Sequence, residues 1–343
     1  MRNKKVMHVL STNKLSGAEN IAITIINNLK NFNSYYCSPK GSIQKVLLNQ
    51  SIKFIGMKKF SYLNMLKCIY KLKPDIIHSH DFTASLFSVL IPIRAKKVVH
   101  IHQNPLWLKN PKSLKLILFN FTCKHCDAIV FASEQIKNEF IYSSRFKDKI
   151  KIIYNLVDKE YILKKSQLKD EKEYDVLFVG RLVPEKNPIL FLKIVKEIDI
   201  NKKVAIIGDG ILKYNCLEFI KQNNMNNVEL LGFKENPYAY MRKSKINIST
   251  SIVEGFGLTI IESILLGNIV LLPRIGGFLN VFRNIEEVFC DNISDYIKKI
   301  NFYLNEMNER NNLQKDLNKT VLKYTNKSNY IVQWEKVYKD CSK

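Results

Sequence analysis

The stretch Ile246-Asn-Ile-Ser-Thr-Ser-Ile-Val-Glu-Gly-Phe-Gly-Leu-Thr-Ile-Ile-Glu-Ser-Ile-Leu-Leu-Gly267 changes its hydrophobic period halfway along. Its first part, Ile246–Thr250, alternates apolar and polar residues and predicts a short strand. Its last part has apolar residues at helical spacing and predicts a helix that ends at Gly267. These residues are Leu258, Ile261, Ile264 and Leu265. The stretch therefore predicts a strand, a glycine-bearing turn and a helix.

Two carboxylates fall in this segment, Glu254 in the turn and Glu262 about one turn into the helix. Gly255 and Gly257 leave room for a ligand to approach the backbone. The free N–H groups at the helix start favour an anion such as a phosphate. Because carboxylates accept hydrogen bonds from hydroxyls, the segment predicts a receptor for a sugar nucleotide.

Strand-like and helical runs alternate along the whole chain. The alternation begins at Val6–Ser11 and restarts at Asp175–Gly180, after a charged and poorly patterned stretch that we interpret as a linker, Asp158–Tyr174. This pattern predicts an α/β protein with parallel sheets flanked by helices and ligands at the carboxyl ends of the strands. We expect two domains, 1–158 and 159–327, and a closing helix at 328–343 that joins the first domain and buries an apolar stripe.

Length and composition exclude several classes of protein. A chain of 343 residues with 46% hydrophobic residues can build two packed cores, which excludes a disordered protein. No apolar stretch reaches the roughly 20 residues that span a bilayer. The best, Leu86–Ile93, is interrupted by Pro92 and followed by Arg94. The apolar part of residues 1–10 is too short for a secretory signal, so we expect a cytoplasmic protein.

The seven cysteines are scattered and odd in number, which argues against a disulfide framework. Cys123-Lys-His-Cys126 has the spacing of a zinc ligand pair but lacks a second pair. We therefore expect a helical segment with two buried thiols.

The net charge of +23 is concentrated in the first half. Residues 1–160 hold 26 Lys and Arg against 9 Asp and Glu, whereas residues 161–343 hold 28 against 22. Such a field predicts an anionic partner: a lipid surface, a phosphorylated acceptor or a nucleic acid. A lysine-rich composition that keeps the protein soluble explains the charge equally well.

Two further loops follow predicted strands. The loop within Val179-Gly-Arg-Leu-Val-Pro-Glu-Lys-Asn-Pro188 carries Arg181 and Lys186, two cations at a fixed spacing that can hold a diphosphate. The loop Leu15–Glu19 contains Gly17, which permits close approach of a phosphate to a helix start. The dinucleotide fingerprint G-x-G-x-x-G is absent from the first half, which argues against an NAD-type site.

Four histidines flank two strand ends, His78 with His80 and His100 with His102. Strand alternation points His100 and His102 to the same side. His102 is nearest the loop and is the strongest functional candidate among them. Gly208-Asp-Gly210 predicts a tight strand-to-helix turn, to which we assign no chemistry.

Taken in order, the motifs resemble glycosyltransferase family 4. They are Gly180-Arg-Leu-Val-Pro-Glu-Lys-Asn187, Gly208-Asp-Gly210, Leu231-Gly-Phe233 and Glu254-Gly-Phe-Gly-Leu-x-x-x-Glu262. The resemblance is strong over residues 175–280 and looser over 1–150, where Ser16-Gly-Ala-Glu19 and His102 match in kind. Two departures are a single glycine in the first loop and no acidic residue in Gly276–Asn280.

The resemblance implies a GT-B fold, with two Rossmann-like domains and an interdomain cleft, the donor bound mainly by the second domain and the acceptor mainly by the first. It implies transfer of a sugar from a nucleotide diphosphate with retention of configuration, and no bound metal or other cofactor. Glu262 would hold the ribose hydroxyls and Glu254 the transferred hexose. Arg181, Lys186 and the amides of Phe256, Gly257 and Leu258 would hold the diphosphate. Gly17, Gly180, Phe233 and Gly255 complete the expected donor site.

Arg181, Lys186, Glu254 and His102 are the expected catalytic residues. Breaking the sugar–phosphate bond leaves negative charge on the diphosphate, so donors aimed at that phosphate stabilise the transition state. The resemblance implies a front-face displacement in which the leaving phosphate takes the acceptor proton. A glycosidase-like pair of carboxylates is disfavoured, since both glutamates lie beside phosphate-binding groups.

These observations predict a retaining glycosyltransferase that moves a hexose or N-acetylhexosamine to a lipid-linked saccharide during synthesis of a bacterial O-antigen or capsule. The basic first half predicts attachment to the anionic inner face of the plasma membrane. A GT-B-type sugar-nucleotide epimerase, which would turn over the donor without an acceptor, is the main alternative. A nucleic-acid-binding protein is disfavoured because no basic helix or aromatic platform of a known module is found, and the cations and glutamates argue against a noncatalytic sugar binder.

Overall fold

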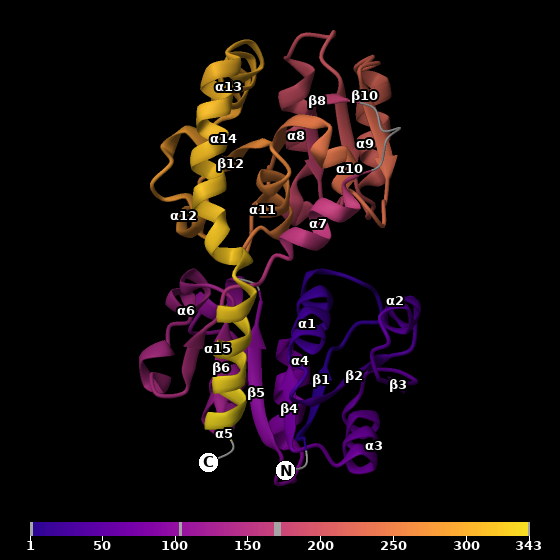
Figure 1. The fold of residues 1–343 in the computed structure, drawn as a ribbon, viewed down its shortest axis with the longest axis vertical. Helices are drawn as coiled ribbons and strands as arrows, with labels where there is room; N and C mark the ends of the chain where they lie inside the picture. Colours follow the sequence, from indigo (N-terminus) through magenta and orange to yellow (C-terminus); the bar gives the residue numbers. More distant parts are fainter. Residues whose placement is uncertain (1–2, 103–104, 168–172, 342–343) are drawn as a thin grey trace. The chain divides into compact units, whose positions relative to one another are not determined.

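The computed structural model describes residues 3–102, 105–167 and 173–341 of the chain (Figure 1). Part of the expected linker, 168–172, and the end of the expected closing helix, 342–343, lie outside the described residues. The chain forms two compact units, one of residues 1–156 with 326–343 and one of residues 157–325.

The first unit is built on a parallel sheet with the strand order β3-β2-β1-β4-β5-β6-β7. Its strands are β1 (Lys5–Val9), β2 (Asn33–Pro39), β3 (Phe54–Met57), β4 (Ile76–Ser79), β5 (Lys96–Ile101), β6 (Ala128–Phe131) and β7 (Ile150–Ile152). Its helices are α1 (Gly17–Asn28), α2 (Ile43–Asn49), α3 (Tyr62–Leu72), α4 (Phe82–Leu90), α5 (Leu114–His125), α6 (Glu134–Glu139) and α15 (Lys327–Asp340). Every strand pair in this sheet is parallel, because helices make the crossovers.

The sequence determines these elements through buried strands and capped helices. The central strands β1, β4 and β6 are buried on both faces, as covered parallel strands are, although β1 and β4 carry histidines among their apolar residues. Ser61, Asp81 and Ser133 cap the helices that follow β3, β4 and β6, and each side chain accepts a hydrogen bond from the amide three residues on. Cys123 and Cys126 are buried at the end of α5, as expected.

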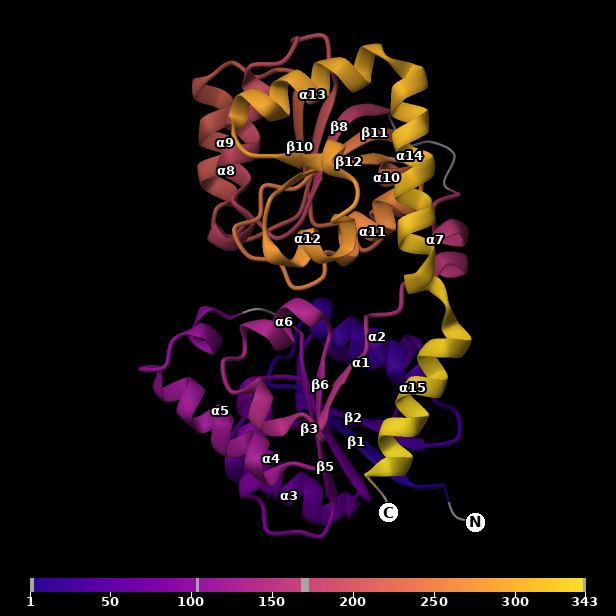
Figure 2. The same ribbon diagram turned by 90° about the vertical axis from the view of Figure 1, so that its left-hand side faces the viewer.

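The last described helix, α15, returns to the first unit (Figure 2). It buries Tyr330, Trp334, Val337 and Tyr338, whereas Ile331, the fifth residue of the predicted apolar stripe, is half-buried. The Asn31 side-chain amide donates to Glu335 Oε1 across 2.8 Å, and the Phe32 ring lies edge-on to Tyr338 with 5.1 Å between centroids. A segment more than 150 residues away in sequence therefore completes the core of this unit.

The second unit contains a parallel sheet with the strand order β10-β9-β8-β11-β12-β13. Its strands are β8 (Tyr174–Val179), β9 (Val204–Ile207), β10 (Val228–Gly232), β11 (Ser244–Ile248), β12 (Ile269–Pro273) and β13 (Phe289–Cys290). Its helices are α7 (Lys159–Lys165), α8 (Pro188–Lys196), α9 (Lys213–Gln222), α10 (Tyr238–Arg242), α11 (Leu258–Leu265), α12 (Gly276–Phe282), α13 (Ile293–Asn305) and α14 (Met307–Val321). Short 3-10 helices are found in both units. In the first unit they are η1 (Leu106–Lys109) and η2 (Ser143–Phe146), and in the second unit η3 (Pro184–Lys186), η4 (Glu286–Val288) and η5 (Leu322–Thr325).

The expected fold class, α/β with two parallel sheets, is confirmed. The stretch around Glu254 forms β11, a turn and α11, as its hydrophobic period predicts. No helix in the described part of the chain is long and apolar enough to cross a membrane.

Candidate functional site

Four loops of the second unit leave the same edge of its sheet. β8 lies between β9 and β11, with β10 beyond β9, and all four strands are parallel. The residues after these strands are Arg181 (β8), Gly208-Asp-Gly210 (β9), Phe233 (β10) and Glu254 (β11). The carboxyl edge of a parallel sheet is where ligands bind in such folds. The topology therefore brings these sequence motifs to one edge.

The turn at Gly208 supports the loop that carries Arg181. A Cβ atom on Gly208 would lie 1.8 Å from the Gly180 carbonyl oxygen, so only glycine fits there. The amide of Leu182 also donates to Asp209 O across 2.9 Å. The turn is structural, in agreement with the sequence, and it holds the backbone on both sides of Arg181.

Lys186 and Glu254 form an ion pair, Nζ to Oε2, across the two loops that follow β8 and β11. Their side chains are only 22% and 17% exposed. The loops are also tied by their backbones, since the amide of Ile252 donates to Glu185 O across 2.8 Å. The Thr250 hydroxyl donates to the carbonyls of Lys186 and Asn187, at 3.1 and 2.9 Å. The pair is thus held in place by its surroundings.

Glycines let the start of α12 pack against the Glu254 turn. A Cβ atom on Gly277 would lie 2.3 Å from the Glu254 carbonyl oxygen. Gly257 precedes α11 with a φ of 77°, a left-handed conformation that favours glycine, and a Cβ there would lie 2.5 Å from the Phe278 ring. Gly257 is therefore required by the turn itself, and the Phe278 ring lies where its Cβ would be.

The start of α11 presents amides suited to an anion. The amides of Ile260 and Ile261 both donate to Gly257 O, so those of Leu258 and Thr259 precede the helix hydrogen bonds. The Phe256 side chain is buried, with its ring edge-on to that of Tyr324 at a centroid separation of 4.9 Å. This packing fixes the backbone that leads into the helix start, where the helix dipole favours negative charge.

Glu262 is a half-buried carboxyl within α11. Burial raises its pKa to about 7, and the hydrogen bond from the Tyr238 hydroxyl, at 3.4 Å, opposes that rise. The Glu262 carboxyl therefore changes between its protonated and ionised forms near neutral pH. Sequence reasoning missed Tyr238, because its place at the start of α10 follows no motif.

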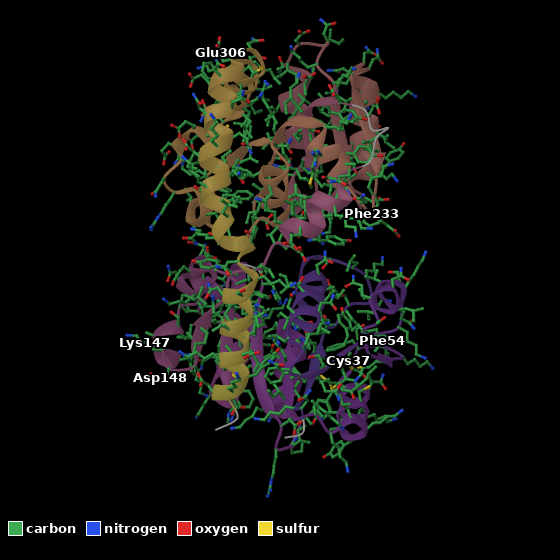
Figure 3. The ribbon with its side chains drawn as sticks, in the orientation of Figure 1. Cys37, Phe54, Lys147, Asp148, Phe233 and Glu306 are labelled. Atoms are coloured by element: carbon green, nitrogen blue, oxygen red, sulfur yellow. The ribbon has the colours of Figure 1, made fainter. Side chains whose placement is uncertain are left out.

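Two expected donor residues are exposed. The carbonyl of Arg181 accepts a hydrogen bond from the Val183 amide across 3.0 Å, but its guanidinium makes no hydrogen bond or ion pair with any residue in the described ranges and is available to an anion. Phe233, just past β10, is 64% exposed (Figure 3). Gly180 and Gly255 flank the loops already described, and the Gly255 amide donates to Glu254 Oε1 across 3.2 Å.

The first unit contains two of the expected site residues. Gly17 is exposed and begins α1. Its loop is held by Glu19, a buried carboxylate that accepts hydrogen bonds from the hydroxyls of Thr12 and Ser16. His102 is half-buried, with Nε2 3.1 Å from His80 Nδ1.

His102 belongs to a cluster of five histidines. The other members are His8, His78, His80 and His100, and all four are buried. Sequence reasoning missed His8, although its strand pairs with β4 so that His8 is opposite His78. Burial lowers the pKa of His102 to about 3. Its ring is therefore neutral and weakly basic, which suits hydrogen bonding better than general-base catalysis.

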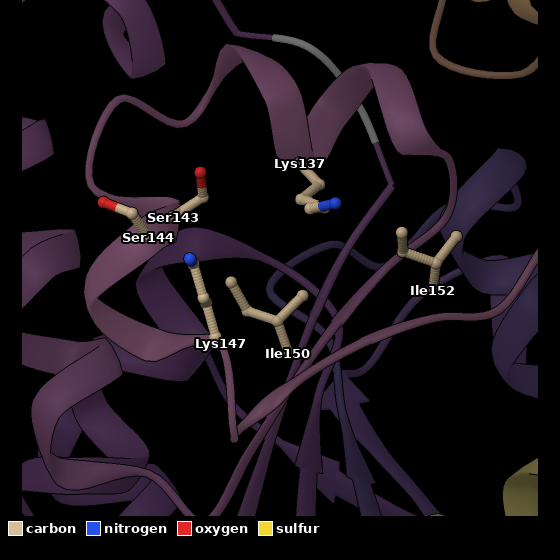
Figure 4. A pocket seen from close by; sticks show the side chains of 6 residues that line it. All are labelled: Lys137, Ser143, Ser144, Lys147, Ile150 and Ile152. Carbon is tan, nitrogen blue, oxygen red and sulfur yellow. The ribbon is translucent and has the colours of Figure 1, made fainter.

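A separate hollow of about 320 Å³ opens in the first unit (Figure 4). It is lined by Lys137, Ser143, Ser144, Lys147, Ile150 and Ile152. Lys137 is already paired with Glu134, at 3.2 Å. None of the residues expected from the sequence lines this hollow, so the predicted chemistry lies elsewhere.

Comparisons with known proteins match both halves of the chain to glycosyltransferase families. The family described as glycosyl transferases group 1 matches residues 160–320, and the family described as Glycosyltransferase Family 4 matches residues 37–161. An uncharacterised glycosyltransferase of Methanocaldococcus jannaschii is 31% identical over 237 residues, which span 64% of this chain and 64% of that relative.

Another relative covers nearly the whole chain. It is the Campylobacter jejuni enzyme named GalNAc-alpha-(1->4)-GalNAc-alpha-(1->3)-diNAcBac-PP-undecaprenol alpha-1,4-N-acetyl-D-galactosaminyltransferase, 26% identical over 90% of this chain and 91% of its own. Among solved structures, Anabaena HepE, in complex with UDP and glucose, superposes with a TM-score of 0.85 and 17% identity over 98% of this chain and 100% of its own. That likeness shows the fold. With both halves matched by glycosyltransferase families, the chain belongs to glycosyltransferase family 4 and has the GT-B type of fold.

Proposed function

We propose that the protein is a retaining glycosyltransferase that moves a hexose or N-acetylhexosamine from a nucleotide-diphosphate sugar to a lipid-linked saccharide. The pathway would be synthesis of a bacterial O-antigen or capsule. The observation that carries the proposal is the Lys186–Glu254 pair beside the start of α11, with Glu262 inside the same helix. The name of the Campylobacter jejuni relative, which describes an undecaprenol-linked acceptor, supports the acceptor class.

The chemistry of these groups matches the parts of a nucleotide sugar. Arg181, Lys186 and the amides at the start of α11 would hold the diphosphate. Glu254 would accept hydrogen bonds from the transferred sugar, and Glu262 from the ribose. A donor that brings a phosphate to the ammonium and a hydroxyl to the carboxylate satisfies both halves of the Lys186–Glu254 pair.

The first unit would bind the acceptor, and the reaction would need no metal. As the sugar–phosphate bond breaks, the leaving diphosphate gains charge that Lys186, Arg181 and the helix start neutralise. The acceptor hydroxyl attacks the anomeric carbon from the side of the leaving phosphate, and that phosphate takes the proton. Attack from this side keeps the anomeric configuration. His102, a neutral ring, would donate or accept a hydrogen bond at the sugar.

Peripheral attachment to the inner face of the plasma membrane is part of the proposal, and α5 is the element best suited to it. Leu116, Phe119 and Cys123 face the core, whereas Leu114, Ile117 and Phe121 are 68%, 54% and 41% exposed. Their spacing of three and four residues places them on one helix face. Exposed lysines flank this face at positions 112, 115 and 124. Apolar side chains beside lysines are typical of helices that lie on anionic lipid.

The test of the reaction is an assay of the purified protein with a panel of nucleotide sugars, with and without undecaprenol-linked saccharides. We expect product with an acceptor, and nuclear magnetic resonance of the new linkage to show the anomeric configuration of the donor. Glu254→Gln should abolish the product. An inverted product would contradict retention, and an epimerised donor formed without acceptor would favour the sugar-nucleotide epimerase.

The test of membrane attachment is sedimentation with vesicles of phosphatidylglycerol and phosphatidylcholine. The wild type should sediment with phosphatidylglycerol vesicles at low salt and be released at high salt. The double variant Ile117→Glu, Phe121→Glu should lose binding. Leu48→Glu, at a residue of α2 that is 78% exposed, is the matched control and should retain it. Equal binding by all three proteins would reject α5 as the attachment surface.

A further inference from the structure

Five of the six histidines of the chain gather on one face of the first-unit sheet. They come from three adjacent strands: His8 from β1, His78 and His80 from the end of β4, and His100 and His102 from the end of β5. Helix α15 covers this face, and the Trp334 ring lies 4.8 Å from the ring of His78 and 5.0 Å from that of His100. The cluster is thus enclosed between a sheet and a helix.

Half of the ten ring nitrogens of the cluster lack a hydrogen-bond partner within the described part of the chain. Within the described part of the chain, buried nitrogens without a hydrogen bond are Nε2 of His8, Nε2 of His78, both nitrogens of His100 and Nδ1 of His102. Buried polar atoms of this kind destabilise a core unless something satisfies them. An imidazole that carries one proton can offer the lone pair of its second ring nitrogen to a metal.

The rings of His78 and His80 are each oriented by a hydrogen-bond partner at Nδ1, as the rings of metal-binding histidines usually are. His78 Nδ1 lies 2.7 Å from the Tyr338 hydroxyl, and His80 Nδ1 lies 3.1 Å from His102 Nε2. Holding the proton on Nδ1 leaves the lone pair on Nε2. His80 Nε2 already lies 3.0 Å from His8 Nδ1. Metal-ligating histidines are oriented by such outer partners, which fix the ring and its tautomer.

We propose that His8, His78 and His80 form a binding site for a divalent transition metal, with zinc the best match. One ring nitrogen from each lies within 4.8 Å of the other two. Zinc–nitrogen bonds of about 2.0–2.1 Å in a tetrahedron place ligand nitrogens roughly 3.4 Å apart, so nitrogens that are up to 4.8 Å apart must approach by up to about 1.4 Å. A water or hydroxide would take the fourth position, as at other three-histidine zinc sites, and hydroxide would offset part of the buried charge.

The site would be structural. The metal would join β1 to β4 and, through Tyr338, to α15. It shares no residue with the expected donor site, but His80 Nδ1 lies 3.1 Å from Nε2 of His102, the expected catalytic histidine, so the metal would also hold that ring in place. It does revise the expectation, taken from the family resemblance, that the protein holds no metal at all.

The experiment is a titration of the full chain, stripped with a chelator and dialysed, with Zn²⁺ by calorimetry and with Co²⁺ by visible absorption. We expect one equivalent of either metal, a Co²⁺ spectrum typical of tetrahedral nitrogen coordination, and a higher Tm with Zn²⁺. His8→Gln and His78→Gln should lower the affinity for Zn²⁺ at least 100-fold. The exposed His125, the one histidine outside the cluster, gives the control: His125→Gln should bind as the wild type does.

Tyr338→Phe keeps the packing of α15 and removes the hydroxyl at His78, so it tests the site even if a histidine variant fails to fold. We expect a loss in Zn²⁺ affinity of about 10- to 100-fold, as is usual for outer partners of a metal site. Absence of Zn²⁺ binding by the wild type would overturn the proposal. So would unchanged affinity in His78→Gln and Tyr338→Phe, or thiolate-to-cobalt absorption bands, which would place the metal at cysteines.

Discussion

The carboxyl edge of the second-unit sheet and the histidine face of the first-unit sheet concentrate functional groups in opposite ways. At the edge, Lys186 and Glu254 are charged, paired and partly exposed. On the face, five imidazoles pack together, four of them buried, and α15 contacts His78 and His100. Charges near water can exchange a protein partner for a ligand at small cost, whereas buried neutral rings keep their arrangement as long as the core around them does. The edge therefore depends on its charges and the face on its packing.

The largest effect is expected from a substitution in α15, the helix that packs on the histidine face of the first-unit sheet. Trp334→Ala removes a fully buried ring that contacts His78 and His100, so the free energy of unfolding of the first unit should fall by about 3–5 kcal/mol. Denaturant titration followed by circular dichroism measures the change. Val332→Ala, at a position of α15 that is 63% exposed, should stay within about 0.5 kcal/mol of the wild type. Equal losses in both variants would mean that the face does not depend on α15.

Removing a charge at the edge should act on the reaction with little effect on folding. Lys186→Ala takes away the proposed donor to the leaving phosphate and leaves Glu254 without its partner, so turnover should fall about 100-fold, roughly 2.7 kcal/mol. Arg181→Ala should lower turnover at least tenfold, about 1.4 kcal/mol. Initial rates at saturating donor give both values. Lys193→Ala, an exposed lysine on α8, is the control, and wild-type turnover in Lys186→Ala or Arg181→Ala would remove the diphosphate assignment for that residue.

A backbone substitution tests whether the edge also depends on packing. Gly277→Ala places a Cβ 2.3 Å from the Glu254 carbonyl oxygen, so the turn must shift, with an expected loss of about 1–3 kcal/mol in stability and a higher KM for the donor. Thermal unfolding and donor titration measure the two effects. Gly17→Ala, where no atom lies within 4 Å of the new Cβ, should leave stability unchanged. A Gly277→Ala protein with wild-type KM would show that the turn tolerates the shift.

The smallest expected effect is a pH dependence of donor binding. Burial raises the pKa of Glu262 to about 7, so the carboxylate that we propose to accept hydrogen bonds from the ribose hydroxyls forms above pH 7 and is lost below it. The Kd for the nucleotide should therefore rise severalfold from pH 8 to pH 6. Because its pKa is raised in the folded state, the ionised carboxyl of Glu262 destabilises that state. Its contribution to the free energy of unfolding therefore becomes more favourable as the pH falls from about 7 towards 4.5. Calorimetry across this range should show no such rise in Kd for Glu262→Gln.

The sequence predicts the two regions unequally, for a physical reason. The edge is made of local signals: a hydrophobic period that switches at Gly257, and charges at a fixed place after a strand. These were enough to identify β11, α11 and the Lys186 loop, which the structure confirms. The strand β2 escaped prediction because its residues Asn33–Pro39 are polar at the start, and β3 because Gly56 interrupts its apolar residues.

The histidine face depends on contacts between distant segments. His8 is 70 residues from His78 in sequence, and only the pairing of β1 with β4 shows that the two meet. Tyr338 and Trp334 reach the cluster from the far end of the chain. Likewise, the Tyr238 hydroxyl meets Glu262 only through the packing of α10 near α11. Sequence spacing carries no information about such contacts until the sheet order is known.

The place of α15 sets the order in which a growing chain can fold. Residues 1–156 leave the ribosome first, yet their core remains open on the side that Trp334 and Tyr338 cover. The second unit, residues 157–325, can fold while the core of the first unit is still incomplete. This order reverses the usual N-terminal-first folding of domains during synthesis. Until residues 327–340 are made, the five histidines and the apolar residues around them are open to solvent. The nascent first unit would thus be a target for chaperones through most of translation.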